Sequence, residues 1–476
     1  MLHLKNTQHI KMNIQNASLA DIASGLRNKT ITAQSIMEQC NNSYQKHEPV
    51  SNAYKTWAGE QALAQARHVD NLISKGVFTG PLMGIPSSVK DLFGVPGMPT
   101  FAGSSAALPQ SWEQAGGVVK SLIKQAAPIT GKTHTVEFAF GGIGINSHWG
   151  TPHNPWDKNN HRIPGGSSSG AGVSLLQGSA LLALGTDTAG SVRIPASYAG
   201  VVSLKLTQGR WPQDGAVPLS FTLDTPGILT RTVQDAIYAF CAMDSTIRNS
   251  STSVREAGSL HGIKVGIPGN FFWDDTDPSI EKAVRDVIPE VSKLGASVVD
   301  TIFPGCDPVY EIFKAGGLGA SELSSFLNIN MPEKIDQLDP MVKIRVEGAD
   351  NISSVEYLRR CNAIIQASKQ AEAYFNDFDI LITPTIAISA PTVSELENID
   401  VYRNANMMVL RNTSIANLMG FCGLSMPIGL DSNGIPVGLQ LMAGPGKEEL
   451  LLSVAALLEQ TLGNGQQILG TAPLFS

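Results

Sequence analysis

The stretch "GGSSSGAGVSLLQGSALLALGTDTAGSVRIPA", residues 165–196, joins two Gly- and Ser-rich turns through an apolar segment. The first turn carries the serines 167–169, and the second ends at Ser191. Such composition usually marks turns or linkers. Here "LLALGTD" is typical of a buried strand, and "VRIPASYAG" indicates a helix start with free amide donors. The stretch predicts two turns that place serine hydroxyls close to backbone N–H groups.

Helix and strand patterns alternate outward from this stretch, which favours an α/β fold. Within residues 18–75, three segments have apolar residues at three- and four-residue spacing, two of them behind a Ser or Thr that can cap a helix. We find no internal repeat or linker, so we expect a single domain over residues 1–476 with a helical N-terminal region at 1–75. Further helices are expected at 116–127, 232–243, 278–295, 305–375 and 447–462, strands at 84–93, 128–133, 181–187 and 379–387, and a hairpin at 423–444.

Composition excludes several classes of protein. Of the 476 residues, 42% are hydrophobic and 16% charged, which suffices for a large core. The net charge of −7 and the absence of a basic cluster argue against a nucleic-acid or anionic-membrane surface. No apolar run approaches about 20 residues, so no membrane span is expected. The five separated cysteines and the lack of a signal-peptide pattern at the start favour a cytoplasmic protein.

Four motif matches have weak support. "GKT" at 131–133 resembles the end of a phosphate loop, but Ala126 occupies the position of its first glycine. Ser168 is the central residue of a GxSxG pattern, yet no buried strand precedes it and the only later histidine is His261. Ser87 begins an SxxK pattern in a stretch that favours a strand rather than a helix. The fourth match, a metal site, would combine residues with loop spacing that are better interpreted as solvated: His148, His153, His161 and Asp157.

Lys90 offers a stronger alternative. A serine needs a nearby base to become a nucleophile at neutral pH. A lysine can be that base if burial lowers its pKa from about 10.4. The stretch "IPSSVKDLF" predicts Lys90 at the inner end of an apolar strand. A salt bridge from Lys90 to Asp91 is an equally good interpretation of this stretch alone.

The stretch around the two serine turns resembles the core motif of the amidase signature family. Three further blocks resemble the family in the same order along the chain. They are "GIPSSVKDLFGVPGMPTFAGS" (84–104), "GKTHTVEFAFGGIGINSHWGTPHNPWD" (131–157) and "TSIANLMGFCGLSMPIGLDSNGIPVGLQLMAG" (413–444). The resemblance implies the α/β amidase signature fold, a large mixed β-sheet with helices on both faces.

The resemblance also implies roles for individual residues. The family uses a Ser–cis-Ser–Lys triad, which falls on Ser191 as nucleophile, Ser167 as bridging serine and Lys90 as base. The cis peptide would join Gly166 to Ser167. The oxyanion donors would be the amides of 188–191 (Thr188, Ala189, Gly190 and Ser191), and the supporting residues would be Gly166, Ser168, Asp187 and Arg193. Alanine at 189 and serine at 169 depart from the glycines common in the family, and neither change removes a catalytic atom.

The implied function is amide hydrolysis through an acyl-enzyme, with no metal and no organic cofactor. We expect a small-molecule amide as substrate and no nucleic-acid or membrane partner, and a homodimer remains open. The alternative is the glutaminase component of a tRNA-dependent amidotransferase complex, although the lysine segment looks more like that of stand-alone amidases. The substrate pocket of the family is variable. Here "FPGCDPVYEIFKAGG" (303–317) and "VYRNANMMVLRN" (401–412) are candidate contributors.

Overall fold

A mixed 11-stranded sheet forms the centre of the fold in the part of the chain that the computed structural model describes, residues 12–248 and 258–476. The strands are β1 (Tyr54–Trp57), β2 (Ser87–Lys90), β3 (Ile129–Thr133), β4 (Leu182–Asp187), β5 (Val202–Lys205), β6 (Thr225–Thr230), β7 (Lys264–Pro268), β8 (Ser297–Thr301), β9 (Ile380–Pro384), β10 (Cys422–Leu430) and β11 (Pro436–Ala443). Their order is β1-β3-β2-β4-β6-β5-β10-β11-β9-β7-β8. β2 pairs in parallel with both β3 and β4, whereas β10 and β11 form the predicted antiparallel hairpin.

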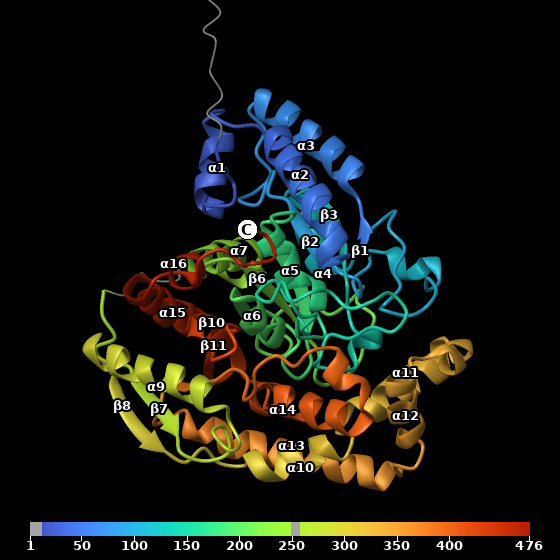
Figure 1. Ribbon diagram of the computed structural model, residues 1–476, viewed down its shortest axis with the longest axis vertical. Helices are drawn as coiled ribbons and strands as arrows, with labels where there is room; N and C mark the ends of the chain where they lie inside the picture. The colour runs from blue at the N-terminus through green and yellow to red at the C-terminus, as the bar shows by residue number, and fades with distance from the viewer. Residues whose placement is uncertain (1–11, 249–257) are drawn as a thin grey trace, which may run out of the picture.

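Helices surround this sheet (Figure 1). They are α1 (Leu19–Arg27), α2 (Ala33–Ser51), α3 (Gly59–Ser74), α4 (Gly117–Lys124), α5 (Ser169–Gln177), α6 (Arg193–Ala199), α7 (Val233–Met243), α8 (Ser245–Arg248), α9 (Pro278–Lys293), α10 (Cys306–Lys314), α11 (Gly319–Asn330), α12 (Pro340–Ala349), α13 (Ser354–Tyr374), α14 (Ile399–Leu418), α15 (Glu448–Leu462) and α16 (Gly465–Leu469). None of the described helices is long and apolar enough to cross a membrane.

The predicted helical N-terminal region is confirmed for its described residues. Ser18 and Thr32 cap α1 and α2 through capping boxes, as their position before the apolar pattern indicates. The sequence analysis missed β1, a four-residue strand that pairs with β3 at the edge of the sheet. Residues 1–11, which include most of the start of the chain, lie outside the described residues.

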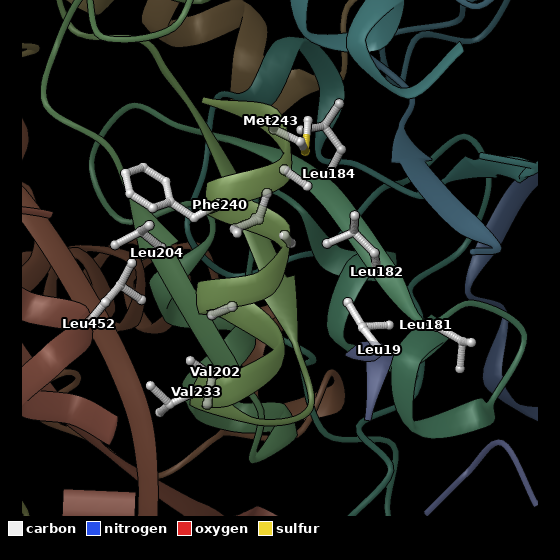
Figure 2. Packing of buried hydrophobic residues seen from close by; sticks show 14 of the residues in the cluster. Leu19, Leu181, Leu182, Leu184, Val202, Leu204, Val233, Phe240, Met243 and Leu452 are labelled. Carbon is white, nitrogen blue, oxygen red and sulfur yellow. The ribbon is translucent and has the colours of Figure 1, made fainter. Parts of the chain in front are cut away.

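Strand β4 shows why helices cover both faces of the sheet. Successive side chains of a strand point to opposite faces. Leu182 and Leu184 therefore pack in one cluster with Phe240 of α7, as Figure 2 shows. Ala183, between them, packs in another cluster with Leu175 of α5. This arrangement confirms the predicted α/β class.

We predict that Phe240→Ala lowers the free energy of unfolding by about 3–5 kcal/mol, because a buried aromatic leaves a cavity when truncated. Phe240 is fully buried, and Figure 2 shows it between α7 and Leu204 of the sheet. The control is Phe221→Ala, since Phe221 is 58% exposed. Its effect should stay within about 0.5 kcal/mol. Urea denaturation followed by circular dichroism checks both, and equal effects would contradict this account of the core.

Candidate active site

Lys90 is the last residue of β2 and is completely buried. Its Nζ donates hydrogen bonds to Ser167 Oγ at 2.7 Å and to Thr186 Oγ1 at 2.8 Å. Burial lowers the pKa of Lys90 to about 7, although Asp224 and Asp187 act in the opposite direction. The amine is thus close to half neutral near pH 7, and its hydrogen bonds connect it to the serine turn.

The alternative ion pair between Lys90 and Asp91 does not form. Asp91 instead pairs with Lys132 of β3, with Nζ and Oδ1 2.9 Å apart and both side chains buried. Lys132 is the lysine of the "GKT" segment, so this segment serves a buried ion pair. Consecutive strand positions point to opposite faces, which separates Asp91 from the Lys90 amine.

The first serine turn is fixed by backbone contacts. The Gly166–Ser167 peptide is cis, as the family resemblance implies. A Cβ on Gly166 would lie 2.7 Å from the amide nitrogen of Gly144, so only glycine fits there. The Val136 amide donates to the Ser167 carbonyl at 3.1 Å. These contacts hold the Ser167 hydroxyl against Lys90.

Ser168 connects the two turns. Its amide donates to the Ser191 carbonyl at 3.2 Å, and its hydroxyl donates to the Thr186 carbonyl at 3.3 Å. The described residues show no hydrogen bond between the hydroxyls of Ser167 and Ser191. Catalytic hydrogen bonds are often long without substrate and shorten in the complex. Ser168 is therefore a supporting residue, since its hydroxyl bonds to backbone.

Asp187 organises the second turn. Its carboxylate accepts from the Gly190 amide at 2.7 Å and the Val192 amide at 3.2 Å, and it pairs with Arg193 at 3.0 Å. Burial opposes its ionisation, but the Arg193 guanidinium outweighs burial and lowers the pKa of Asp187 to about 2. Arg193 also donates to Asn417 Oδ1 at 2.6 Å. Both predicted supporting residues thus hold the turn from behind.

The predicted oxyanion donors differ from one another in this structure. The Gly190 amide is occupied by Asp187, so the expectation of four available donors does not fit at Gly190. The amides of Thr188, Ala189 and Ser191 have no hydrogen-bond acceptor among the described residues. Gly190 has a φ of +130°, and a Cβ there would lie 2.1 Å from Thr413 Oγ1. Glycine at 190 is required by backbone shape and by the close approach of α14.

Asp224 lies behind Thr188 and interacts electrostatically with Lys90. Thr188 Oγ1 donates to Asp224 Oδ1 at 2.6 Å, and the amides of Leu219 and Ser220 donate to its other oxygen. Burial raises the pKa of Asp224 to about 6, partly offset by these hydrogen bonds and by Lys90. Asp224 was not anticipated from the sequence, because it lies 36 residues beyond Thr188.

Ser191 opens onto a largely apolar pocket of about 300 Å³. Both predicted segments contribute to it, 313–317 from the first and 406–410 from the second, and Ala189 also lines its wall. The volume lies at the lower end of the range for small-molecule sites. The remaining lining residues are Ala139, Phe140, Gly141, Thr188, Leu219, Leu223, Leu318, Gly319, Ala320, Arg345, Gly348, Ala349 and Ile352.

The weaker motif matches lie apart from this arrangement. The His153 and His161 rings stack with centroids 3.8 Å apart, while His148 contacts Glu137. Asp157 accepts from Arg162 at 2.8 Å. Among the described residues, no group of three or more metal-ligating side chains is found.

Sequence reasoning missed Thr186, Thr413 and Asn417. Thr186 accepts from Lys90, Thr413 Oγ1 donates to the Ala189 carbonyl at 2.7 Å, and Asn417 donates to the Asp187 carbonyl at 2.9 Å. A signal was available for the last two. They lie four residues apart, on one face of a helix, within the block that resembles the family.

A family comparison agrees with this site. The Amidase family model matches residues 35–452. The chain belongs to the amidase family. It is therefore an enzyme of the amidase type, a hydrolase of C–N bonds.

Relatives extend the comparison over nearly the whole amidase chain. It is 50% identical to 2-amino-5-chloromuconic acid deaminase of Comamonas testosteroni, over 97% of this chain and 100% of that protein. It is 31% identical to the glutaminase component of the glutamyl-tRNA(Gln) amidotransferase of a Cyanothece species, over 93% and 98%. A crystal structure described as an amidase superposes with a TM-score of 0.84 at 28% identity, over 94% and 100%. The amidase signature fold is thus confirmed.

We predict that Asp187→Asn lowers kcat by roughly 10²-fold or more, because a disordered turn misplaces oxyanion donors. The amide side chain cannot accept from all of the Asp187 donors, and Arg193 would keep a buried unpaired charge. The control is Asp157→Asn, which also breaks an arginine pair but lies outside the pocket. Steady-state kinetics checks both. A folded Asp187→Asn protein with wild-type kcat would contradict the role of this carboxylate.

Proposed function

We propose that this amidase hydrolyses the C–N bond of a small carboxamide through an ester on Ser191, with Lys90 as base and Ser167 as proton relay. One observation supports this above all. The Lys90 amine is fully buried, lacks an ion-pair partner among the described residues, and lies 2.7 Å from the Ser167 hydroxyl. Since burial lowers its pKa to about 7, it can be neutral and accept a proton at physiological pH.

In the proposed reaction, Ser191 Oγ bonds to the carbonyl carbon. Its proton passes to Ser167, and the Ser167 proton passes to Lys90. The C–N bond then breaks, and the nitrogen leaves with the proton that Lys90 returns through Ser167. Water attacks the resulting ester by the same relay, which releases the carboxylic acid and restores Ser191.

Charge develops on the carbonyl oxygen during both attacks. We infer that the amides of Thr188, Ala189 and Ser191 stabilise it, since none of them is committed elsewhere in the described structure. The Gly190 amide, bonded to Asp187 at 2.7 Å, instead keeps the turn in shape. Fixed donors of this kind act without reorganising during the reaction.

A second candidate reaction is the hydrolytic release of ammonia from an unsaturated amino acid. The 50% identical relative is named as a deaminase of 2-amino-5-chloromuconic acid, which has no carboxamide. In the imine tautomer of such a compound, the carbon that bears nitrogen is electrophilic, as an amide carbonyl is. The role of an amidotransferase glutaminase is less well supported, because that relative is only 31% identical.

We predict that Ser191→Ala lowers kcat by roughly 10⁴-fold or more, because the bond-forming atom is lost. Ammonia release should be measured on a panel of aliphatic, aryl, ureido and peptide amides and 2-aminomuconic acid. Lys90→Ala should lower kcat by about 10²–10⁴-fold, the usual contribution of a general base. We expect a smaller loss for Ser167→Ala.

The matched control for these variants is Ser169→Ala. Ser169 belongs to the same turn, and its buried hydroxyl has no hydrogen-bond partner. This variant should keep wild-type kcat. Wild-type turnover by Ser191→Ala on every substrate of the panel would refute the proposed mechanism.

The pH dependence follows from Lys90. Below its pKa the amine is protonated and cannot accept a proton, so kcat/KM should fall as the pH drops below about 7 and level off above it. Initial rates between pH 5 and 9 check this, with protein stability followed in parallel. An activity that increases toward pH 5 would rule out a neutral lysine as the base.

A further inference from the structure

Arg345 gives the apolar pocket an unmatched positive charge. It belongs to α12 and lines the same cavity as Ser191. No ion pair to Arg345 is found in the described parts of the chain. By contrast, Lys314, the other cation of the lining, pairs with Glu311 at 2.6 Å. A guanidinium without an acidic partner is unusual in such a setting, because its desolvation is costly unless an anion compensates it.

The guanidinium of Arg345 is held in place. Its Nε donates to the Met341 carbonyl at 2.8 Å, and its Cζ lies 4.3 Å from the centre of the Phe140 ring. The described structure shows no hydrogen bond from Nη1 or Nη2, and Nη2 is buried. One side of the group is therefore fixed while its terminal N–H donors are left without acceptors.

Nearby acids do not supply that acceptor. Asp339 is the N-cap of α12, where its oxygens accept from the Met341 amide at 2.7 Å and from the Ser147 hydroxyl. The Tyr402 hydroxyl is close enough to favour the charged form of Arg345, but it does not meet hydrogen-bonding geometry with Nη2. Asn406, also on the pocket wall, accepts from the Gly142 amide at 2.9 Å through Oδ1. Its amide nitrogen then faces the pocket as a further donor.

We propose that the substrate is an acid whose carboxylate, remote from the scissile C–N bond, binds the guanidinium of Arg345. This proposal rests on the proposed function and adds the substrate class. A planar guanidinium binds a carboxylate through two parallel hydrogen bonds. The intervening apolar walls suit a short carbon chain, and the volume of about 300 Å³ suits a small one. Arg345 then determines specificity, while Ser191 performs the chemistry.

Binding to the Ser191→Ala protein tests this proposal independently of turnover. Isothermal titration calorimetry should compare the monoamides of malonic, succinic, glutaric and muconic acids with neutral carboxamides of equal chain length. We expect the best acid to bind roughly tenfold to 150-fold more tightly than its neutral counterpart, the usual gain from hydrogen bonds to a charged group. Arg345→Gln in the same background should abolish this preference and change binding of the neutral amide by less than about threefold.

The matched control is Lys343→Gln, which removes a positive charge from the same helix. Lys343 pairs with Asp336 at 3.2 Å and is not part of the pocket lining, so the preference should persist. The inference is wrong if no acid binds more tightly than its neutral counterpart, a comparison that needs no arginine variant. It is also wrong if the preference survives Arg345→Gln. Failure of the proposed function has a different signature, namely substrate turnover that does not depend on Ser191.

Discussion

The buried amine of Lys90 is the constraint on which the site depends. A lysine without an acid partner is unstable in its charged form inside a protein, and this favours the neutral base. The pleat of β2 makes the arrangement possible. Lys90 reaches the hydroxyls of Ser167 and Thr186, whereas the next residue, Asp91, pairs with Lys132. Two adjacent charged residues thus have separate environments, one suited to catalysis and one to a structural ion pair.

The catalytic turn depends on a second buried group, the Asp187–Arg193 pair. This pair extends beyond the turn, because Arg193 also donates to Asn417 of α14 and to Gln440 of β11 at 2.7 Å. Residues far apart in the sequence therefore set the position of Ser191. Every member of this network is buried, so a change in any one leaves partners unsatisfied.

Local patterns predicted much of the fold, and the site was predictable to the extent that it lies in contiguous motifs. Capping residues and apolar spacing located the helices, whereas the short edge strand β1 was missed because four residues carry little periodic signal. The placement of β10 between β5 and β11 depends on pairing over more than 200 residues, which local patterns do not encode. Lys90, Ser167 and Ser191 were assigned through resemblance. Occupation of the Gly190 amide by Asp187 could not be inferred, since it depends on the direction of a single N–H group.

Chemistry and selectivity are located in different parts of the chain. The proposed reacting groups come from strands and turns between residues 84 and 191, where nearly every side chain near the serine turns is buried. Much of the pocket wall comes from residues 313–352 and 406–410, on helices whose outer faces are exposed. A substitution in the wall can therefore alter the substrate without disturbing the buried hydrogen bonds around Lys90. This division explains how a single catalytic arrangement can serve relatives that act on different compounds, and why the substrate has to be inferred from wall residues such as Arg345 rather than from the serines.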